Sequence, residues 1–162
     1  MGSGKSTLGL LVAVRLRAPF IDLDERVEAV AGCSVAEIFA SEGESAFRRR
    51  ELEALRALAA SAPERAVIST GGGIVETAAA APLVRGLGRV VWLRADPAAC
   101  VDRVGATRDG RPLLAGDWSA RWDRRVSLYE AWADAVVSTH PESVNVSLAA
   151  LEALTPFGPH PE

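Results

Sequence analysis

The sequence predicts an α/β protein in which a parallel sheet is covered by helices on both faces. Short apolar segments alternate along the chain with longer segments of helical spacing, which is typical of strands joined by helical crossovers. A glycine-rich run, GSGKST at residues 2–7, stands directly ahead of one of the helical segments. Because parallel strands need cover on both faces, we expect a three-layer fold of the phosphate-loop type.

The first part of the chain is expected to alternate helices with one short strand. Residues 6–17 have helical spacing, and residues 19–22 form a short apolar strand. A serine and a glutamate three residues apart make a capping box that opens a helix at 34–39. Residues 45–60 again carry apolar side chains at helical spacing.

The second part continues the alternation. A buried strand runs into three consecutive glycines, and an Asp-Pro pair marks the start of another helix at Asp96. A glycine- and arginine-rich loop at 105–117 is expected to be a mobile lid. The remaining strands are expected at 66–69, 89–93 and 135–138, and the remaining helices at 76–85, 118–133 and 141–154.

Length and composition indicate one domain. A chain of 162 residues with 49% hydrophobic and 24% charged residues is an ordinary globular protein, which excludes a disordered chain or a coiled coil. We expect residues 1–154 to form the domain and residues 155–162 to be a flexible tail.

The net charge and the cysteine content exclude several classes of binding partner and cofactor. A net charge of −3 gives no basis for nucleic-acid binding, and no apolar run reaches the roughly 18–20 residues that span a bilayer. Cys33 and Cys100 form no CxxC pair, so we expect neither a disulfide framework nor a zinc site. The expected protein is a cytoplasmic monomer.

The run at residues 2–7 matches the second half of the phosphate-loop motif G-x-x-x-x-G-K-[ST]. Glycines let backbone N–H groups approach phosphate oxygens, and a helix that starts there points its positive end at the anion. Lys5 is the single lysine beside 17 arginines, and we expect it to reach the β- and γ-phosphates, while Ser6 ligates Mg²⁺. The expected ATP-binding residues of this loop are Gly2, Ser3, Gly4, Lys5, Ser6 and Thr7. The alternative is a chance match in a flexible start.

The motif is incomplete in this sequence. Its first glycine and the strand that normally precedes it are not among the 162 residues. In phosphate-loop folds that strand lies in the middle of the sheet. We therefore expect one central position of the sheet to be empty, and we expect Met1 to be an internal methionine or the chain to be truncated.

Further motifs follow in a fixed order. Asp22 and Asp24 form a D-x-D after a strand, and the later motifs are G-E-x-x-F-R-x-x-E at 43–51, the glycines at 71–73, R-P-L-L at 111–114 and R-x-x-L-Y at 125–129. This ordered set resembles the shikimate kinase family, from residue 1 to about residue 154. The resemblance implies that the 3-hydroxyl of shikimate is phosphorylated by ATP with Mg²⁺, giving 3-phosphoshikimate and ADP in chorismate and aromatic amino acid biosynthesis.

The side chains suit that chemistry. A substrate carboxylate is best bound by a forked guanidinium, which makes Arg48 and Arg125 the candidates. Asp24 is placed to accept a hydrogen bond from a nucleophilic hydroxyl. The backbone of Gly71, Gly72 and Gly73 is accessible to a ligand, and in the family the middle glycine touches shikimate.

Residues elsewhere in the chain are expected to complete the ATP-binding part of the site. Asp22 would support Mg²⁺ together with Ser6. Arg111, on the expected lid, would balance the charge of the transferring phosphate, as an arginine finger does. Lys5, Asp24 and Arg111 are therefore the expected catalytic residues. Arg103 is the candidate for the adenine, with Arg108 left open because the lid is one residue longer than is common in the family.

Each assignment has a plainer alternative. Asp22 and Asp24 are also placed to cap the next helix, and Arg48 belongs to a run of three arginines that suits a solvated face. The three glycines are also compatible with a simple tight turn. Arg111 has two acidic neighbours for an ion pair, at positions 109 and 117.

Two other functions remain open from the sequence. One is another small-molecule kinase of the same fold, such as a gluconate kinase, which the ordered motifs disfavour. The other is a truncated relative without activity that binds nucleotide weakly or acts as an interaction module, which the half phosphate loop favours.

Overall fold

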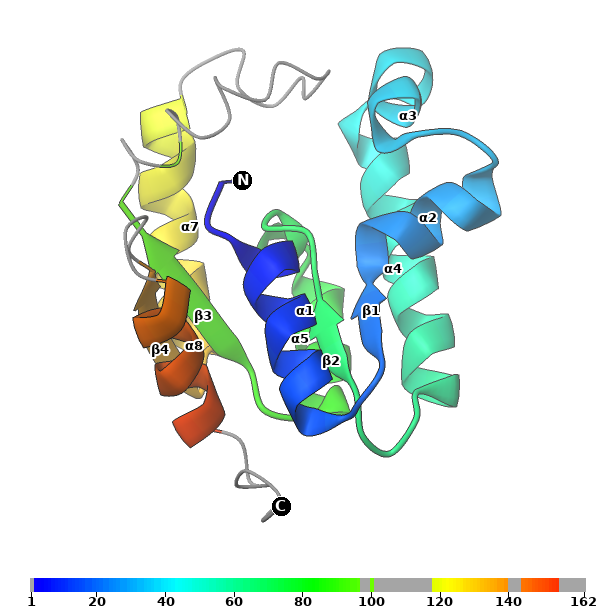
Figure 1. Cartoon of the computed structure of the whole chain (residues 1–162). Coiled ribbons are helices and arrows are strands. Elements are labelled where there is room, and N and C mark those ends of the chain that lie inside the picture. The colour runs from blue at the N-terminus through cyan, green and yellow to red at the C-terminus, as the bar shows by residue number, and fades with distance from the viewer. Residues whose placement is uncertain (1, 97–99, 101–117, 140–143, 155–162) are drawn as a thin grey trace.

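The computed structural model describes residues 2–96, 100, 118–139 and 144–154 (Figure 1). The expected lid at 105–117, the arginines at 103, 108 and 111, and the expected tail at 155–162 lie outside the described residues.

Helices and strands alternate, and most lie where the sequence placed them. The elements in chain order are α1 (Lys5–Leu16), β1 (Phe20–Asp22), α2 (Leu23–Ala31), α3 (Val35–Glu42), α4 (Glu44–Ser61), β2 (Val67–Ser69), η1 (Ile74–Glu76), η2 (Ala78–Ala80), α5 (Ala81–Leu87), β3 (Val91–Ala95), α7 (Trp118–Trp132), β4 (Ala135–Thr139) and α8 (Val144–Ala153). The capping box is confirmed, because Ser34 Oγ accepts from the Glu37 N–H at 3.2 Å and Glu37 Oε2 accepts from the Ser34 N–H at 2.7 Å.

Two segments differ from the prediction. The helix expected at 76–85 is a pair of 3₁₀ turns, η1 and η2, followed by the shorter helix α5, which has a proline in its first turn. Helix α2 was expected only through the alternative in which Asp22 and Asp24 cap the next helix. It begins directly after β1 because the Asp22 carboxylate caps it, accepting from the Asp24 N–H at 3.0 Å. Asp22 therefore does act as a helix cap.

All the described strand pairs are parallel, as predicted. β1 pairs with β2 in the register Phe20↔Val67 to Asp22↔Ser69, and β3 pairs with β4 in the register Val91↔Ala135 to Ala95↔Thr139. Among the described residues no strand joins β2 to β3, so the strands form two separate pairs, which agrees with the central position of the sheet that was expected to be empty. The two pairs stand side by side with helices around them (Figure 1).

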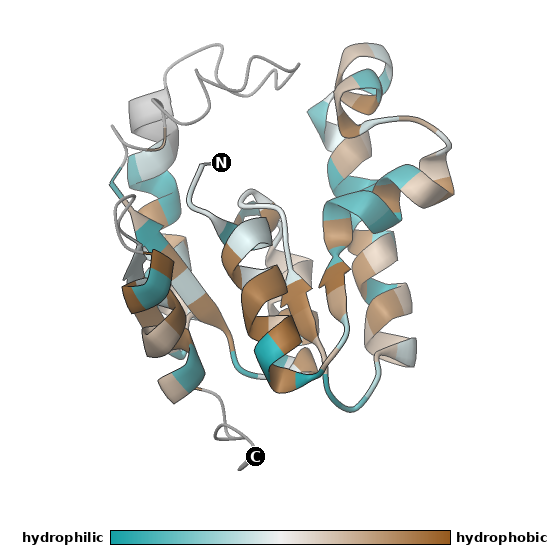
Figure 2. Ribbon diagram, viewed as in Figure 1, coloured by the Kyte–Doolittle hydropathy of each residue, from teal (hydrophilic) through white to brown (hydrophobic). Residues whose placement is uncertain are grey.

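Hydrophobic residues are frequent along the strands β1 and β2 and along α1 (Figure 2), and apolar side chains of helices pack on both faces of the strands. Helices α1 and α8 bury one set against β4, comprising Leu8, Val12, Val137, Leu148 and Leu151. Helices α4, α5 and α7 contribute to a second set on the other side, which includes Ile21, Leu55, Leu58 and Trp132. This arrangement agrees with helices on both faces of a parallel sheet.

A smaller cluster joins α2, α3 and α4. Val27, Ile38 and Phe47 are buried against one another, and this fixes the start of α4 beside the carboxyl end of β1. The start of α4 carries Arg48, so the cluster positions one of the predicted site residues. None of the helices in the described part of the chain is both long and apolar enough to cross a membrane.

Candidate functional site

The glycine-rich run forms a tight loop at the amino end of α1. Gly2 and Gly4 have φ angles of 73° and 85°, which side-chain-bearing residues rarely adopt. A Cβ atom on Gly2 would lie 2.6 Å from the carbonyl oxygen of Cys100, so the space also requires glycine there. The helix begins at Lys5, where the Leu8 N–H donates to the Gly4 oxygen at 2.8 Å. The loop thus presents a helix amino end, which favours an anion.

The side chains at this helix start meet the carboxyl end of β1. Lys5 Nζ lies 3.5 Å from Ser3 Oγ. Ser6 Oγ donates to Asp22 Oδ2 at 3.3 Å, which places a hydroxyl and a carboxylate oxygen together on the surface. Thr7 is exposed on the same turn. Hydroxyl and carboxylate oxygens are the donors that Mg²⁺ prefers, so Ser6 and Asp22 fit that ion.

A metal site made of protein side chains alone is not found here. In the part of the chain that the structure describes, no three His, Cys, Asp or Glu side chains gather closely enough to hold an ion. Mg²⁺ usually keeps several waters and is bound by one or two side chains together with substrate phosphates, so this finding is compatible with a magnesium-nucleotide site.

The three glycines form a turn after β2, and the other predicted residues surround it. A Cβ atom on Gly71 would lie 2.6 Å from Glu51 Oε1 and 3.1 Å from Asp24 Oδ1. Gly73 lies directly against the guanidinium of Arg48, with no room for a side chain. Both glycines are therefore needed because charged groups approach the backbone closely. The segment is also a tight turn, since the Ile74 N–H donates to the Gly71 oxygen at 3.1 Å.

Arg48 is held at the site by two carboxylates of its own helix. Its Nη1 donates to Glu51 Oε2 at 2.7 Å and its Nη2 donates to Glu44 Oε1 at 3.0 Å. The Arg48 side chain is 14% exposed, whereas the Arg50 side chain on the same helix is 37% exposed and pairs with Glu42. Arg48 therefore does not belong to a solvated face.

Glu51 is fully buried and its charge is only partly compensated. Burial, with a smaller contribution from the nearby Asp24, raises the pKa of this carboxyl from 4.5 to about 7, although Arg48 and Arg125 act in the opposite direction. Burial also disfavours the charge of Arg48, but its ion pairs with Glu51 and Glu44 outweigh this and raise the pKa of Arg48.

Arg125 approaches the glycine turn from α7. Its Nε donates to Glu76 Oε2 at 2.8 Å, and its Nη2 contacts the same oxygen. Arg124 contacts the other oxygen of Glu76 but is 67% exposed, against 14% for Arg125. Although burial disfavours the Glu76 charge, the two arginines outweigh it and lower the pKa of Glu76.

Tyr129 connects α7 to the turn. Its hydroxyl donates to the Gly72 oxygen at 2.6 Å, and its ring stacks on Trp92 with the ring centres 5.5 Å apart. Burial raises the pKa of the Tyr129 hydroxyl, which keeps it a proton donor to that carbonyl. The tyrosine therefore ties α7, and with it Arg125, to the glycine turn.

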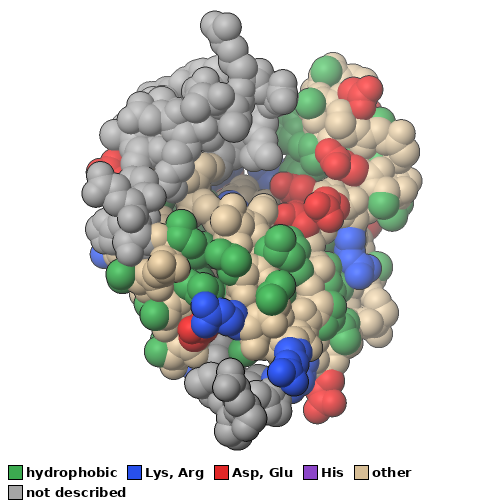
Figure 3. Space-filling view, in the orientation of Figure 1, with side chains coloured by type: hydrophobic (Ala, Val, Ile, Leu, Met, Phe, Trp, Pro, Cys, Tyr) green, Lys and Arg blue, Asp and Glu red, His purple; other side chains and the backbone are tan. Residues whose placement is uncertain are grey.

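The structure thus brings the predicted residues into two adjacent groups. Lys5, Ser6 and Asp22 lie at the start of α1, and the second group around the glycine turn comprises Asp24, Arg48, Gly71, Gly72, Gly73 and Arg125. Asp22 and Asp24 link the two groups through the 3.0 Å cap contact. Acidic side chains gather where β1 meets α2 (Figure 3). Arg103 and Arg111 are outside the described residues.

Sequence reasoning missed three residues of this site as partners of the arginines. Glu44 and Glu51 stand four residues before and three residues after Arg48, a spacing that places all three on one helix face and was a usable signal. Glu76 is separated from Arg125 by 49 residues, so no local pattern connects them.

The glycine loop before α1, the parallel strands and the carboxylates at their carboxyl ends define the class of protein. It is an α/β protein with short parallel strands and a glycine loop at the amino end of a helix, an arrangement typical of proteins that bind phosphate groups.

Comparison with known proteins specifies the family. The family model "Shikimate kinase" matches residues 1–155, and the chain therefore belongs to the shikimate kinase family. Relatives include the shikimate kinases of Moorella thermoacetica, 42% identical over 95% of this chain and 90% of the relative, and of Streptomyces coelicolor, 42% identical over 95% and 91%. The shikimate kinase of Symbiobacterium thermophilum is 49% identical over 72% of this chain, and that alignment spans 66% of the relative's length.

Solved structures agree with this membership. The shikimate kinase of Acinetobacter baumannii, determined in complex with shikimate, superposes with a TM-score of 0.86 at 28% identity, covering 94% of this chain and 87% of that one. The shikimate kinase of Bacteroides thetaiotaomicron superposes with a TM-score of 0.82 at 30% identity, covering 95% and 93%. The predicted family is confirmed, and the gluconate kinase alternative has no support from these matches.

Proposed function

We propose that this chain transfers the γ-phosphoryl group of ATP to the 3-hydroxyl of shikimate, giving 3-phosphoshikimate and ADP. The observation that carries the proposal is the convergence of Arg48, Arg125 and Asp24 on the glycine turn, next to the loop that holds Lys5. Family membership and the shikimate complex of the Acinetobacter baumannii relative support the same substrate.

The two arginines bind the substrate carboxylate. Each guanidinium carries five N–H donors in a fixed fork, and the contacts with Glu44, Glu51 and Glu76 engage only part of them. These carboxylates hold the forks in place before the substrate arrives, so less side-chain entropy is lost on binding. The glycine turn leaves its backbone accessible beside them.

Asp24 orients the reacting hydroxyl. Its carboxylate accepts a hydrogen bond from the 3-hydroxyl, whose oxygen attacks the γ-phosphorus. The bond from that phosphorus to the bridging oxygen of ADP breaks, and the hydroxyl proton passes to Asp24. Lys5 compensates charge on the β- and γ-phosphate oxygens as the bond breaks.

Further groups complete the nucleotide side. Ser6 and Asp22 would hold Mg²⁺, which supplies positive charge to the phosphates when it is bound. Arg111 would act as the arginine finger, and Arg103 or Arg108 would contact the adenine; these assignments rest on the sequence. We also propose a monomer, with residues 1–154 as one domain.

The test compares two matched substitutions on α4. Arg48→Lys replaces a forked guanidinium at the site by a single ammonium, while Arg50→Lys makes the same change on the same helix outside the site. In a coupled ADP-release assay we expect Arg48→Lys to raise the KM for shikimate roughly thirtyfold, since one charged hydrogen bond contributes about 2 kcal/mol. Arg50→Lys should leave the KM unchanged.

The methyl ester of shikimate separates carboxylate recognition from other effects. It should be a poor substrate for the native chain, and Arg48→Lys should penalise it far less than it penalises shikimate. A chain that binds magnesium-ATP but releases no ADP with shikimate would refute the proposed function. Equal KM values for the two substitutions would refute the role of Arg48.

A further inference from the structure

Glu51 is a buried carboxylate with only one of its two oxygens engaged. The residue is 0% exposed, and its Oε2 accepts from Arg48 Nη1 at 2.7 Å. Its Oε1 is also buried and has no hydrogen-bond partner among the described residues. This oxygen lies 2.6 Å from the position that a Cβ on Gly71 would take, and Asp24 Oδ1 lies 3.1 Å from the same position. Oxygens of two carboxylates therefore meet at this point of the glycine turn.

The two arginines of the site are already paired with carboxylates. Arg48 pairs with Glu44 as well as with Glu51, and Arg125 pairs with Glu76. The Arg48 and Arg125 side chains are each 14% exposed, so water and salt screen these charges weakly. A substrate carboxylate bound to both forks adds a negative charge where the described carboxylates already balance the positive ones. Burying an uncompensated charge is strongly unfavourable, so the site needs a compensating positive charge when the substrate binds.

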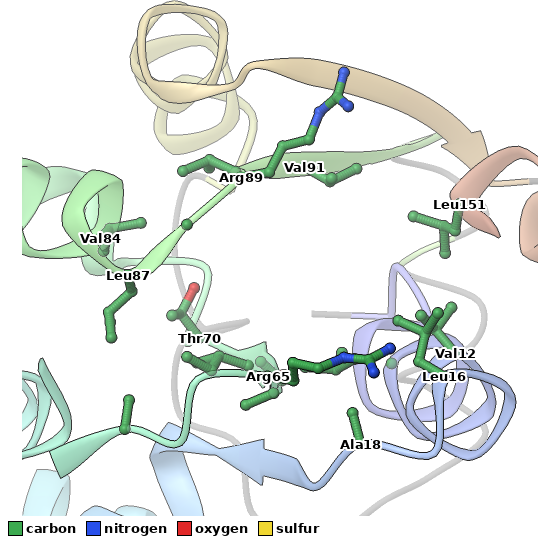
Figure 4. Close-up of a pocket in the computed structure, with 18 of the residues that line it drawn as sticks. Val12, Leu16, Ala18, Arg65, Thr70, Val84, Leu87, Arg89, Val91 and Leu151 are labelled. Carbon is green, nitrogen blue, oxygen red and sulfur yellow. The ribbon is translucent and has the colours of Figure 1, made fainter. Parts of the chain in front are cut away.

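The groups that act on the charge of Glu51 are Asp24, Arg48 and Arg125. Arg65 and Arg89 line the cavity between β2 and β3, which Figure 4 shows and which Glu51 does not line. Titratable side chains of the other elements around α4 have partners elsewhere. Their contacts are Glu28 with the Val35 N–H, Glu37 with Ser34, Glu42 with Arg50, Arg85 with the Ala131 oxygen, and Tyr129 with the Gly72 oxygen.

Glu51 is suited to provide the compensating charge near neutral pH. Burial raises the pKa of its carboxyl to about 7, so this group exchanges a proton in the range where the substrate carboxylate is ionised. A second carboxylate on Arg48 repels the ionised form of Glu51 and shares the guanidinium that favours it. The pKa of Glu51 therefore rises further when the substrate binds.

We propose that Glu51 takes up one proton from solvent when the substrate carboxylate binds Arg48 and Arg125, which keeps the charge of the buried site constant. The proton binds at Oε1, while Oε2 continues to accept from Arg48. Neutral Glu51 no longer competes with the substrate for the positive charge of the guanidinium. This role of Glu51 rests on the proposed function, because it requires a carboxylate substrate at the two arginines.

Calorimetry measures the proton uptake directly. Shikimate is titrated into the native chain without nucleotide, at pH 8, in two buffers of different ionisation enthalpy, and the difference in heat gives the number of protons. We expect about one proton, because Glu51 is mostly ionised in the substrate-free chain at pH 8 and mostly protonated in the complex. Since binding takes up a proton, shikimate affinity should fall about fivefold from pH 7 to pH 8.

Glu51→Gln assigns the proton to this residue. Glutamine keeps the shape of the side chain but does not titrate, so this variant should bind shikimate with almost no proton uptake and with an affinity independent of pH in that range. Glu53→Gln, at an exposed position of the same helix, should behave like the native chain. If Glu51→Gln does not fold, carbon-13 NMR of the glutamate carboxyls decides on the native chain. The carboxyl that titrates near pH 7 should then titrate at higher pH when shikimate is bound.

Three results would overturn this role of Glu51 and leave the proposed function standing. They are shikimate binding without proton uptake, the same proton uptake in Glu51→Gln as in the native chain, and a carboxyl titration that shikimate does not shift. A native chain that neither binds shikimate nor releases ADP with it would refute the proposed function and this role together.

Discussion

Replacing Glu51 by glutamine tests whether burial controls the charge of the site. Glu51 is fully buried beside Arg48, and its Oε1 has no hydrogen-bond partner among the described residues. Glutamine keeps the shape of the side chain but does not ionise in this pH range. The substitution therefore isolates the free energy of ionising this one carboxyl inside the protein.

The size and sign of the effect on stability follow from the pKa of Glu51, which is about 7 in the folded chain and 4.5 for an ordinary glutamate. Between these values the folded state binds a proton that the unfolded state has lost, so the free energy of unfolding falls as pH rises. The full loss is about 3 kcal/mol, of which about 2 kcal/mol falls between about pH 5 and about pH 8. The stability of Glu51→Gln, relative to the native chain, should rise by that amount over the same range.

Urea unfolding at both pH values measures this difference. Glu53→Gln is the matched control, because Glu53 lies two residues along α4 and is exposed; it should shift stability by less than about 0.5 kcal/mol. If the difference between Glu51→Gln and the native chain is the same at both pH values, or falls with pH, burial does not dominate at Glu51 and our account of the site electrostatics is wrong.

Three further substitutions test the proposed roles. Lys5→Ala should lower kcat, measured by ADP release, about a hundredfold or more. Shikimate binding, measured by tryptophan fluorescence, should change little. An unchanged kcat would remove Lys5 from the mechanism. Arg125→Lys should weaken shikimate binding roughly thirtyfold in a fluorescence titration, whereas Arg124→Lys, at an exposed position, should not weaken it. Equal shikimate affinities of these two variants would contradict the role of Arg125 in binding the substrate carboxylate. Gly73→Ala should displace the Arg48 guanidinium and raise the KM for shikimate in a folded protein. Gly86→Ala is the control, because an added Cβ there meets no atom within 4 Å, and it should leave the KM unchanged. An unchanged KM for Gly73→Ala would show that the contact between Gly73 and Arg48 is unimportant.

Local structure was predictable because it depends on neighbouring residues. The glycine loop ahead of α1 and the Ser34–Glu37 capping box are interactions within a few positions of the chain, and both are present in the structure. The order of strands and helices follows from apolar periodicity in the same way, and the ordered motifs were enough to identify the family.

The local rules failed where neighbouring signals conflict. The segment expected as a helix at 76–85 becomes two 3₁₀ turns before α5, since the glycine turn and Pro82 interrupt regular helix there. Asp22 was predicted to act as a metal ligand or as a helix cap, and the two roles are compatible. Its Oδ1 caps α2 while its Oδ2 meets Ser6, so the observed contacts are compatible with both.

Taken by itself, the sequence determined the phosphate loop, the family and the set of candidate residues, because each is written in contiguous motifs. Tertiary structure alone decided which carboxylates hold the arginines and that Glu51 is buried enough to shift its pKa to about 7. Contacts such as Glu76 with Arg125 join positions 49 residues apart. Their distance and burial are set by the packing of helices on strands, which no local pattern of residues encodes.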